Sequence, residues 1–239
     1  MLKVPIKQQP DDTTCGPTCL HAVYEYYGAQ IPLEEVIRDV YQFAEGGTLG
    51  SLLAIDALQR GYAATIYSYD LRIFDPTWFE LKREQLKDKL QEQMRYKRNG
   101  RFRLACEAYI RFLELGGQLR FEDLRAGIIR KYMRKGQPVI AGLSATYLYQ
   151  SAREYGELSD YDDVRGEPSG HFVVLRGYDM ETGTIDIADP IGKNPFWEGR
   201  FYRMKIARVI NAILLGIVTY DANLIIITPP KNVRKQCAI

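Results

Sequence analysis

Residues 171–189 constrain the fold more than any other segment, because their pattern predicts two paired β-strands. The run Phe172-Val173-Val174-Leu175 after His171 is apolar and β-branched, which is typical of a buried strand. Residues 179–183 have the composition of a turn, and residues 184–189 form the returning strand. A hairpin closing around residues 180–182 brings Asp189 to within a residue or two of His171, on the same face of the sheet. A histidine and a carboxylate are therefore predicted side by side.

A second constrained feature is a cysteine at the start of a predicted helix. Threonines at 13 and 14 suit a helix N-cap, Pro17 suits the first turn, and Gly28 suits the end. Cys15 then lies where the helix dipole and unpaired N–H groups favour a thiolate and can hold an oxyanion. Gln9, in an extended segment before Pro10, can add a side-chain N–H. Helix position alone is equally compatible with a buried structural thiol and a surface amide.

The chain has only two histidines, so few residues can serve as a base beside Cys15. His21 follows Cys15 by six residues and points roughly 120° away on a helix, so we interpret it as structural or solvent-facing. His171, oriented by Asp189, is the predicted partner. Either residue alone is better explained as a core histidine or a turn carboxylate, and the predicted hairpin favours the pair.

Four separated blocks carry a resemblance to a known family. They are Gln9, Cys15-Gly16-Pro17, residues 170–178 and Ala188-Asp189-Pro190. Together they resemble the C39-like branch of the papain-like cysteine peptidases, whose best-known members cut leader peptides after a double glycine. The resemblance implies a nucleophile at Cys15, a base at His171, an orienting carboxylate at Asp189 and an oxyanion-hole glutamine at Gln9. It covers residues 5–65 and 135–192.

The resemblance implies a cysteine peptidase-like hydrolase that acts on a peptide or protein and needs no cofactor. Thr14 stands where many leader peptidases have an acidic residue, and the chain carries no transporter segment. Peptidase chemistry is thus better supported than a double-glycine substrate. Two alternatives stay open. One is an acyl or peptidyl transferase using the same thioester, and the other is a catalytically idle peptide-binding module.

Composition and patterning predict one α+β domain over residues 1–239, with N-terminal helices packed on an antiparallel sheet. The chain has 239 residues, of which 46% are hydrophobic, enough for a single sizeable core. A formal net charge of +2 gives no general attraction to nucleic acid. The four cysteines lack metal-ligand spacing, and no metal is expected. Residues 206–228 predict a buried helix and a strand rather than a membrane span, so a cytoplasmic protein is expected, with no oligomeric state assigned.

Further elements are expected along the chain. They are helices over 32–43 and over 49–60 (with Thr48 as its cap), strands over 63–68 and 138–143, and a helical insertion over 74–135. The insertion contains a basic cluster, and an acidic segment runs from Glu154 to Glu167 before His171. The basic cluster, formed by Arg95, Lys97, Arg98, Arg101 and Arg103, suits either an anionic partner or a solvated helix end. The acidic segment suits either a cleft-bordering loop that selects basic residues or an exposed connector.

Overall fold

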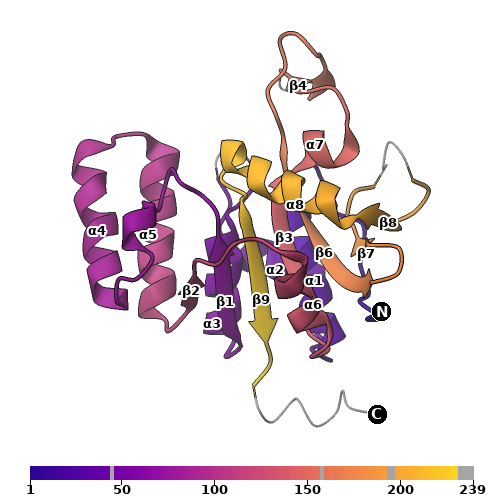
Figure 1. Ribbon diagram of the computed structural model, residues 1–239, viewed down its shortest axis with the longest axis horizontal. Helices are drawn as coiled ribbons and strands as arrows, with labels where there is room; N and C mark the ends of the chain where they lie inside the picture. Colours follow the sequence, from indigo (N-terminus) through magenta and orange to yellow (C-terminus); the bar gives the residue numbers. More distant parts are fainter. Residues whose placement is uncertain (44–45, 157–158, 193–196, 231–239) are drawn as a thin grey trace.

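A central sheet organises the chain, as the computed structural model shows for residues 1–43, 46–156, 159–192 and 197–230. Figure 1 shows helices on both faces of this sheet. The helices are α1 (Cys15–Tyr26), α2 (Leu33–Asp39), α3 (Gly50–Gln59), α4 (Arg83–Tyr96), α5 (Gly100–Glu114), α6 (Ala126–Met133), α7 (Ala145–Tyr149) and α8 (Ile206–Leu215), with 3-10 turns η1 (Pro76–Trp78) and η2 (Gly216–Thr219). The strands are β1 (Ala63–Ser68), β2 (Gln118–Arg120), β3 (Val139–Ser144), β4 (Glu154–Tyr155), β5 (Asp160–Tyr161), β6 (Gly170–Asp179), β7 (Thr184–Ala188), β8 (Phe201–Lys205) and β9 (Asn223–Thr228).

The main sheet has the strand order β2-β1-β9-β3-β6-β7-β8 in the described part of the chain. Its neighbouring strands are antiparallel except for the parallel pair β1 and β2. β4 and β5 form a separate small hairpin. The predicted mixed α and β class, with helices packed on a largely antiparallel sheet, is confirmed.

Both faces of the sheet are covered, which explains the unbroken apolar runs in its strands. On β9, Leu224 and Ile226 pack into one core together with residues of α6, α7 and α8. Ile225 and Ile227 point the other way, into a core that includes residues of α1, α3 and α5. Successive side chains of a strand alternate between faces, so each apolar run supplies both cores.

The hairpin of β6 and β7 forms as predicted, but its register contains a shift. At the turn Asp179 pairs with Thr184, and further along Val174 pairs with Ala188, because a bulge between Leu175 and Gly177 leaves one residue unpaired. Continuing the pairing past Ala188 places Asp189 opposite Val173, two residues from His171 and therefore on the same face. If every residue of the hairpin paired in the register that the turn sets, with none left unpaired, Asp189 would fall opposite Val174 and face the other side. The bulge thus sets which face carries the carboxylate.

The predicted cap at Thr48 is wrong, whereas Thr14 holds its predicted N-cap position without a side-chain bond to the helix. Thr48 does not cap α3, because its hydroxyl donates to the carbonyl of Tyr41 (2.7 Å) and the N-cap position is Leu49. Thr14 does hold the N-cap position of α1 but makes no side-chain cap, since its hydroxyl donates to the Asp11 carbonyl instead. Both threonines stabilise the preceding loops rather than a helix end. The predicted 32–43 helix is also shorter, ending at Asp39.

The 74–135 segment contains α4, α5 and α6, but it also contributes to the main sheet. α4 and α5 lie side by side at one end of the molecule, beyond β2 (Figure 1). β2 pairs with β1, and α6 contributes Ile128 and Ile129 to the core that it shares with α7 and α8. The projecting part is therefore the α4–α5 pair. That residues 74–135 are an insertion in a single domain stays a prediction.

The 206–228 region forms α8, η2 and β9, as the interrupted apolar pattern predicted. None of the helices within the described ranges is long and apolar enough to cross a membrane.

Candidate active site

His171 and Asp189 form a buried hydrogen-bonded pair at the end of the β6–β7 hairpin. Nε2 of His171 lies 2.8 Å from Oδ1 of Asp189. An ionised carboxylate only accepts hydrogen bonds, so Nε2 carries the proton. Oδ1 also accepts from the backbone N–H of Ile191 (3.0 Å), and Oδ2 accepts from the hydroxyls of Tyr149 and Tyr202 (2.7 Å each). Asp189 is 0% exposed, and four donors compensate for the loss of water around it.

The pair favours its charged forms. Burial alone raises the pKa of Asp189, but the charge of His171 and hydrogen bonds from His171, Tyr202 and Tyr149 outweigh burial and lower the pKa below its usual value. Burial alone lowers the pKa of His171, but Asp189 and Cys15 outweigh it and hold the pKa well above the usual range. Burial and the neighbouring carboxylate raise the pKa of both tyrosines, so both remain neutral donors.

Cys15 is the first residue of α1 and interacts with the same histidine. Its side chain interacts electrostatically with His171 and helps to raise the pKa of the imidazole, and Cys15 is 9% exposed. Since Nε2 of the imidazole is held by Asp189, Nδ1 is the nitrogen available to the thiol. The side chain of the N-cap residue Thr14 accepts no hydrogen bond from the helix, which leaves the first N–H groups of α1 without that acceptor. The structure thus brings Cys15, His171 and Asp189 into one group, with His171 interacting with both of the others.

Gln9 is anchored beside this group through its backbone and its side chain. Its N–H donates to the carbonyl of Pro190 (2.8 Å), directly after Asp189. Its side-chain Nε2 donates to the carbonyl of Asp11 (2.8 Å). The reverse amide orientation would set two acceptors against each other, so the observed orientation is the bonded one. Among the described residues the second N–H of this amide has no recorded partner, and Oε1 is buried without one.

A cavity of about 580 Å³ opens over this group. Its described lining includes His171, Gln9 and Tyr149 but not Cys15. The remaining lining comes from three segments that are distant in sequence: Gln8, Pro10, Asp11, Asp12 and Thr13; Ala145, Glu154, Ser159, Tyr161, Ser169 and Gly170; and Ile191 and Gly192. The predicted acidic segment therefore reaches the site through Glu154. Glu157 lies outside the described residues.

The other candidate groups of the chain lie elsewhere. His21 is buried, and its Nε2 contacts the carbonyl of Ile31 at 3.0 Å, which supports the structural interpretation. Cys19 donates to the carbonyl of Phe172 (3.2 Å), and burial raises its pKa well above the usual value. Burial raises the pKa of Cys106 to about 12. Cys237 lies outside the described residues. No group of three metal-ligating side chains occurs in the described part of the chain.

Two residues of the site, Tyr149 and Tyr202, were not assigned a role from the sequence. Tyr149 lines the cavity, but the sequence gives no signal for its bond to Asp189, because α7 is a single short turn. The alternation of β8 is consistent with Tyr202 pointing inward, since Tyr202 and Met204 are buried between exposed neighbours. Neither pattern predicts a bond to Asp189, which is 40 residues from Tyr149 and 13 residues from Tyr202 in the sequence.

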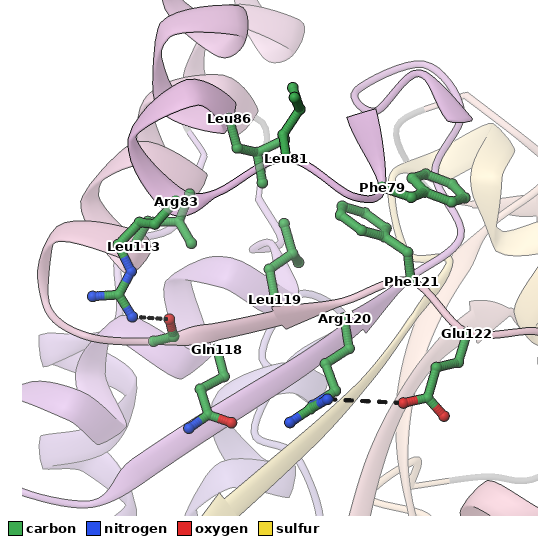
Figure 2. A pocket seen from close by; sticks show the side chains of 11 residues that line it. Phe79, Leu81, Arg83, Leu86, Leu113, Gln118, Leu119, Arg120, Phe121 and Glu122 are labelled. Carbon is green, nitrogen blue, oxygen red and sulfur yellow. Dashed lines mark hydrogen bonds and ion pairs between the residues drawn. The ribbon is translucent and has the colours of Figure 1, made fainter. Parts of the chain in front are cut away.

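A second cavity, of about 470 Å³, lies at the β2 edge of the sheet and contains none of the candidate residues. Figure 2 shows its apolar walls, where Phe79 stacks on Phe121 with ring centroids 4.3 Å apart. Arg83 donates to the carbonyl of Gly117 (3.3 Å), so its charge is already engaged. This cavity is separate from the His171 site.

Part of the chain matches the model of a known protein family. Residues 123–206 match the model of the Peptidase_C39 like family. The resemblance to C39-like peptidases is confirmed. The matched segment contains His171 and Asp189, while Cys15 and Gln9 lie outside it.

The overall fold is that of C39-like papain-fold peptidases. A protein from Bacillus anthracis described as a C39-like peptidase superposes with a TM-score of 0.50 at 15% identity, covering 96% of this chain and 96% of that chain. A double glycine motif protease from an AMS/PCAT transporter, solved in complex with the leader peptide, gives a TM-score of 0.45 at 16% identity over 96% of this chain and 94% of that one. No curated protein sequence matches the chain.

Proposed function

We propose that this protein is a cysteine peptidase-like hydrolase that cleaves a peptide or amide bond. The observation that carries the proposal is the position of His171, between the buried carboxylate of Asp189 and the Cys15 thiol at the start of α1. An imidazole held in this way can take the thiol proton and keep it as an imidazolium, because both neighbours favour its charged form.

The proposed reaction passes through a thioester between the substrate and Cys15. The Cys15 thiolate attacks the substrate carbonyl carbon, and the resulting oxyanion is held by helix N–H groups and by the free amide N–H of Gln9. The intermediate collapses to a thioester as the C–N bond breaks, and His171 gives its proton to the leaving amine. Water then attacks the thioester, with His171 accepting a proton from it and returning that proton to the Cys15 sulfur. Asp189 keeps the imidazole oriented throughout.

The test is alkylation of Cys15 by iodoacetamide as a function of pH, followed by mass spectrometry of the labelled peptides. A Cys237→Ser background removes the thiol that lies outside the described residues. We expect rapid labelling of Cys15 at neutral and mildly acidic pH, because the imidazolium favours the thiolate. Cys19 and Cys106 should remain unlabelled in the folded protein, because burial raises the pKa of both thiols.

Two histidine variants make the test specific. His171→Ala should abolish the reactivity of Cys15 at mildly acidic pH, whereas His21→Gln should keep it, because His21 contacts the Ile31 carbonyl and not the thiol. If wild type and His171→Ala react alike, with the pH dependence of free cysteine, the proposed pair does not operate and a binding module becomes the better interpretation. Product analysis with a competing amine separates hydrolysis from transfer to that amine.

A further inference from the structure

Two buried tyrosines bind the oxygen of Asp189 that is not hydrogen-bonded to His171. Oδ1 of the carboxylate accepts from Nε2 of His171 (2.8 Å), and Oδ2 accepts from the hydroxyls of Tyr149 and Tyr202 (2.7 Å each). Both tyrosines are buried, so water does not compete freely for these bonds. Two hydroxyls are therefore committed to one oxygen of a carboxylate whose other oxygen orients the imidazole.

The two tyrosines reach Asp189 from different elements. Tyr149 ends α7, which begins directly after β3, the neighbour of β6 in the sheet. Tyr202 lies on β8 opposite Ile187 of β7, two residues before Asp189 and on the same face of the sheet. The carboxylate is thus held from the α7 side and from the β8 side, and it cannot turn without breaking one of these bonds.

The α7 turn is itself fixed at both ends. At its start the Ser144 hydroxyl oxygen accepts from the N–H of Tyr147 (3.3 Å), and at its end Gln150 adopts a left-handed conformation with a φ of 54°. The hydroxyl of Tyr147 accepts from Nδ2 of Asn211 on α8 (3.3 Å). The same short turn therefore carries one tyrosine bound to the carboxylate of the site and a second tyrosine bound to α8.

Hydrogen bonds to a carboxylate favour its ionised form, so the two hydroxyls oppose the effect of burial on Asp189. Burial raises the Asp189 pKa, but the charge of His171 and the bonds that it and the two tyrosines donate lower the pKa below its usual value. Loss of a hydroxyl therefore favours protonation of Asp189 at mildly acidic pH. A neutral Asp189 no longer supports the imidazolium that stabilises the Cys15 thiolate.

We propose, resting on the proposed function, that Tyr149 and Tyr202 are positioning residues that act through Asp189. They keep its carboxylate ionised and aligned with the imidazole at mildly acidic pH, and they thereby set the lower pH limit of Cys15 reactivity. A tyrosine hydroxyl suits this task because it stays a neutral donor, since burial and the charge of Asp189 raise the pKa of both tyrosines. A phenylalanine ring would fill the same space and supply no donor.

Other titratable groups near the pair must stay constant in a test of this proposal. On α1, Cys15 interacts with His171, and Cys19 remains a neutral thiol because burial and the charges of Cys15 and Asp189 raise its pKa. Before β9, burial raises the pKa of Asp221 to about 7, and this carboxyl interacts electrostatically with His171. The carboxylates that line the cavity belong to Asp11, Asp12 and Glu154. All of these groups are present in every variant below, so comparison with wild type isolates the tyrosine hydroxyls.

The test is the rate at which Cys15 displaces iodide from iodoacetamide at pH 5, divided by the rate at pH 7, in the Cys237→Ser background. We expect wild type to retain most of its rate at pH 5. Tyr149→Phe and Tyr202→Phe should each lower this ratio by about threefold or more, because each removes a donor to a charged group. Tyr147→Phe is the matched control on the same turn and should change the ratio by less than about 1.5-fold.

Two further measurements separate a role through Asp189 from a loss of folding. Labelling of the buried Cys19 and Cys106 in the same digest detects unfolding, and the ratio is taken at the lowest pH at which both stay unlabelled. In an Asp189→Asn background the imidazolium already lacks its carboxylate, so adding Tyr149→Phe should lower the ratio no further. A second fall of the same size would show that Tyr149 does not act through Asp189.

The outcomes distinguish this proposal from the proposed function. If wild type keeps its reactivity at pH 5 and both tyrosine variants give the ratio of Tyr147→Phe, the positioning proposal is overturned and the proposed function stands. If wild type reacts like His171→Ala, with the pH dependence of free cysteine, the proposed function itself fails and the positioning proposal fails with it.

Discussion

The two tyrosine hydroxyls on Asp189 lead to a quantitative prediction about stability. Tyr202→Phe removes one of two donors to Oδ2, each at 2.7 Å, while retaining the ring that stacks on Trp197. A hydrogen bond to a charged group contributes about 1.5–3 kcal/mol. The hydrogen bond favours the ionised carboxylate, so its loss should raise the Asp189 pKa back toward the usual aspartate value.

The pH dependence has a definite sign. The folded-state pKa of Asp189 is lowered, so its ionisation stabilises the fold above the usual aspartate pKa, and this stability is lost as pH falls through the folded-state value. We therefore expect Tyr202→Phe to lower the free energy of unfolding by about 1.5–3 kcal/mol at pH 7. The deficit should narrow toward about 0.5–1.5 kcal/mol once the carboxyl is protonated in both proteins, because only a neutral hydrogen bond is then lost.

Urea unfolding followed by fluorescence at a series of pH values from 7 downward measures this difference. Tyr69→Phe is the matched control, because the Tyr69 hydroxyl is buried without a hydrogen-bond partner among the described residues. Its removal should leave stability unchanged or slightly increased. The reasoning is refuted if Tyr202→Phe behaves like Tyr69→Phe at pH 7, or if its deficit does not depend on pH.

Two further predictions concern packing and charge. Gly170→Ala should destabilise the protein by about 1–3 kcal/mol in thermal unfolding, because the new Cβ would collide with the Asp221 carboxylate and lie 2.6 Å from the Thr219 hydroxyl oxygen. Gly127→Ala, which meets nothing within 4 Å, should be neutral or stabilising by up to about 1 kcal/mol, and equal losses in both variants would contradict the steric argument. Arg60→Met should cost about 1–3 kcal/mol in urea unfolding, because buried Asp56 then keeps only the Tyr24 hydroxyl (2.6 Å) of its two side-chain partners. Arg38→Met removes a single exposed contact to Asp39 and should change stability by less than about 0.5 kcal/mol, so a loss as large as that of Arg60→Met would refute this ranking.

Much of the site was predictable because its chemistry depends on few residues. With two histidines in the chain, the apolar run after His171 and the turn residues after it were sufficient to predict its pairing with Asp189. The predicted turn, centred on residue 181, correctly brings Asp189 beside His171, but the turn lies slightly elsewhere and a bulge compensates for the difference. The observed turn places Asp179 opposite Thr184, half a residue later, and the bulge restores the register.

Other features depend on contacts that local patterns do not encode. Thr48 has the residue type of a cap, but its hydroxyl reaches the Tyr41 carbonyl, seven residues earlier. The short strand β2 follows two helices and has no strong β pattern, and pairing with β1 gives it its structure. In each case a tertiary partner determines the outcome, and a single sequence does not reveal that partner.

The bulge in β6 also bears on how relatives should be compared with this chain. The unpaired residue is Arg176, between Leu175 and Gly177. Deleting it from the sequence would leave the strand pairing on both sides unchanged. A relative one residue shorter at this point would keep the histidine and the carboxylate on one face, whereas a deletion between positions 171 and 175 would separate them. An alignment that gaps this hairpin should therefore open its gap at Arg176. Counting residues from the turn alone would assign the carboxylate to the wrong position.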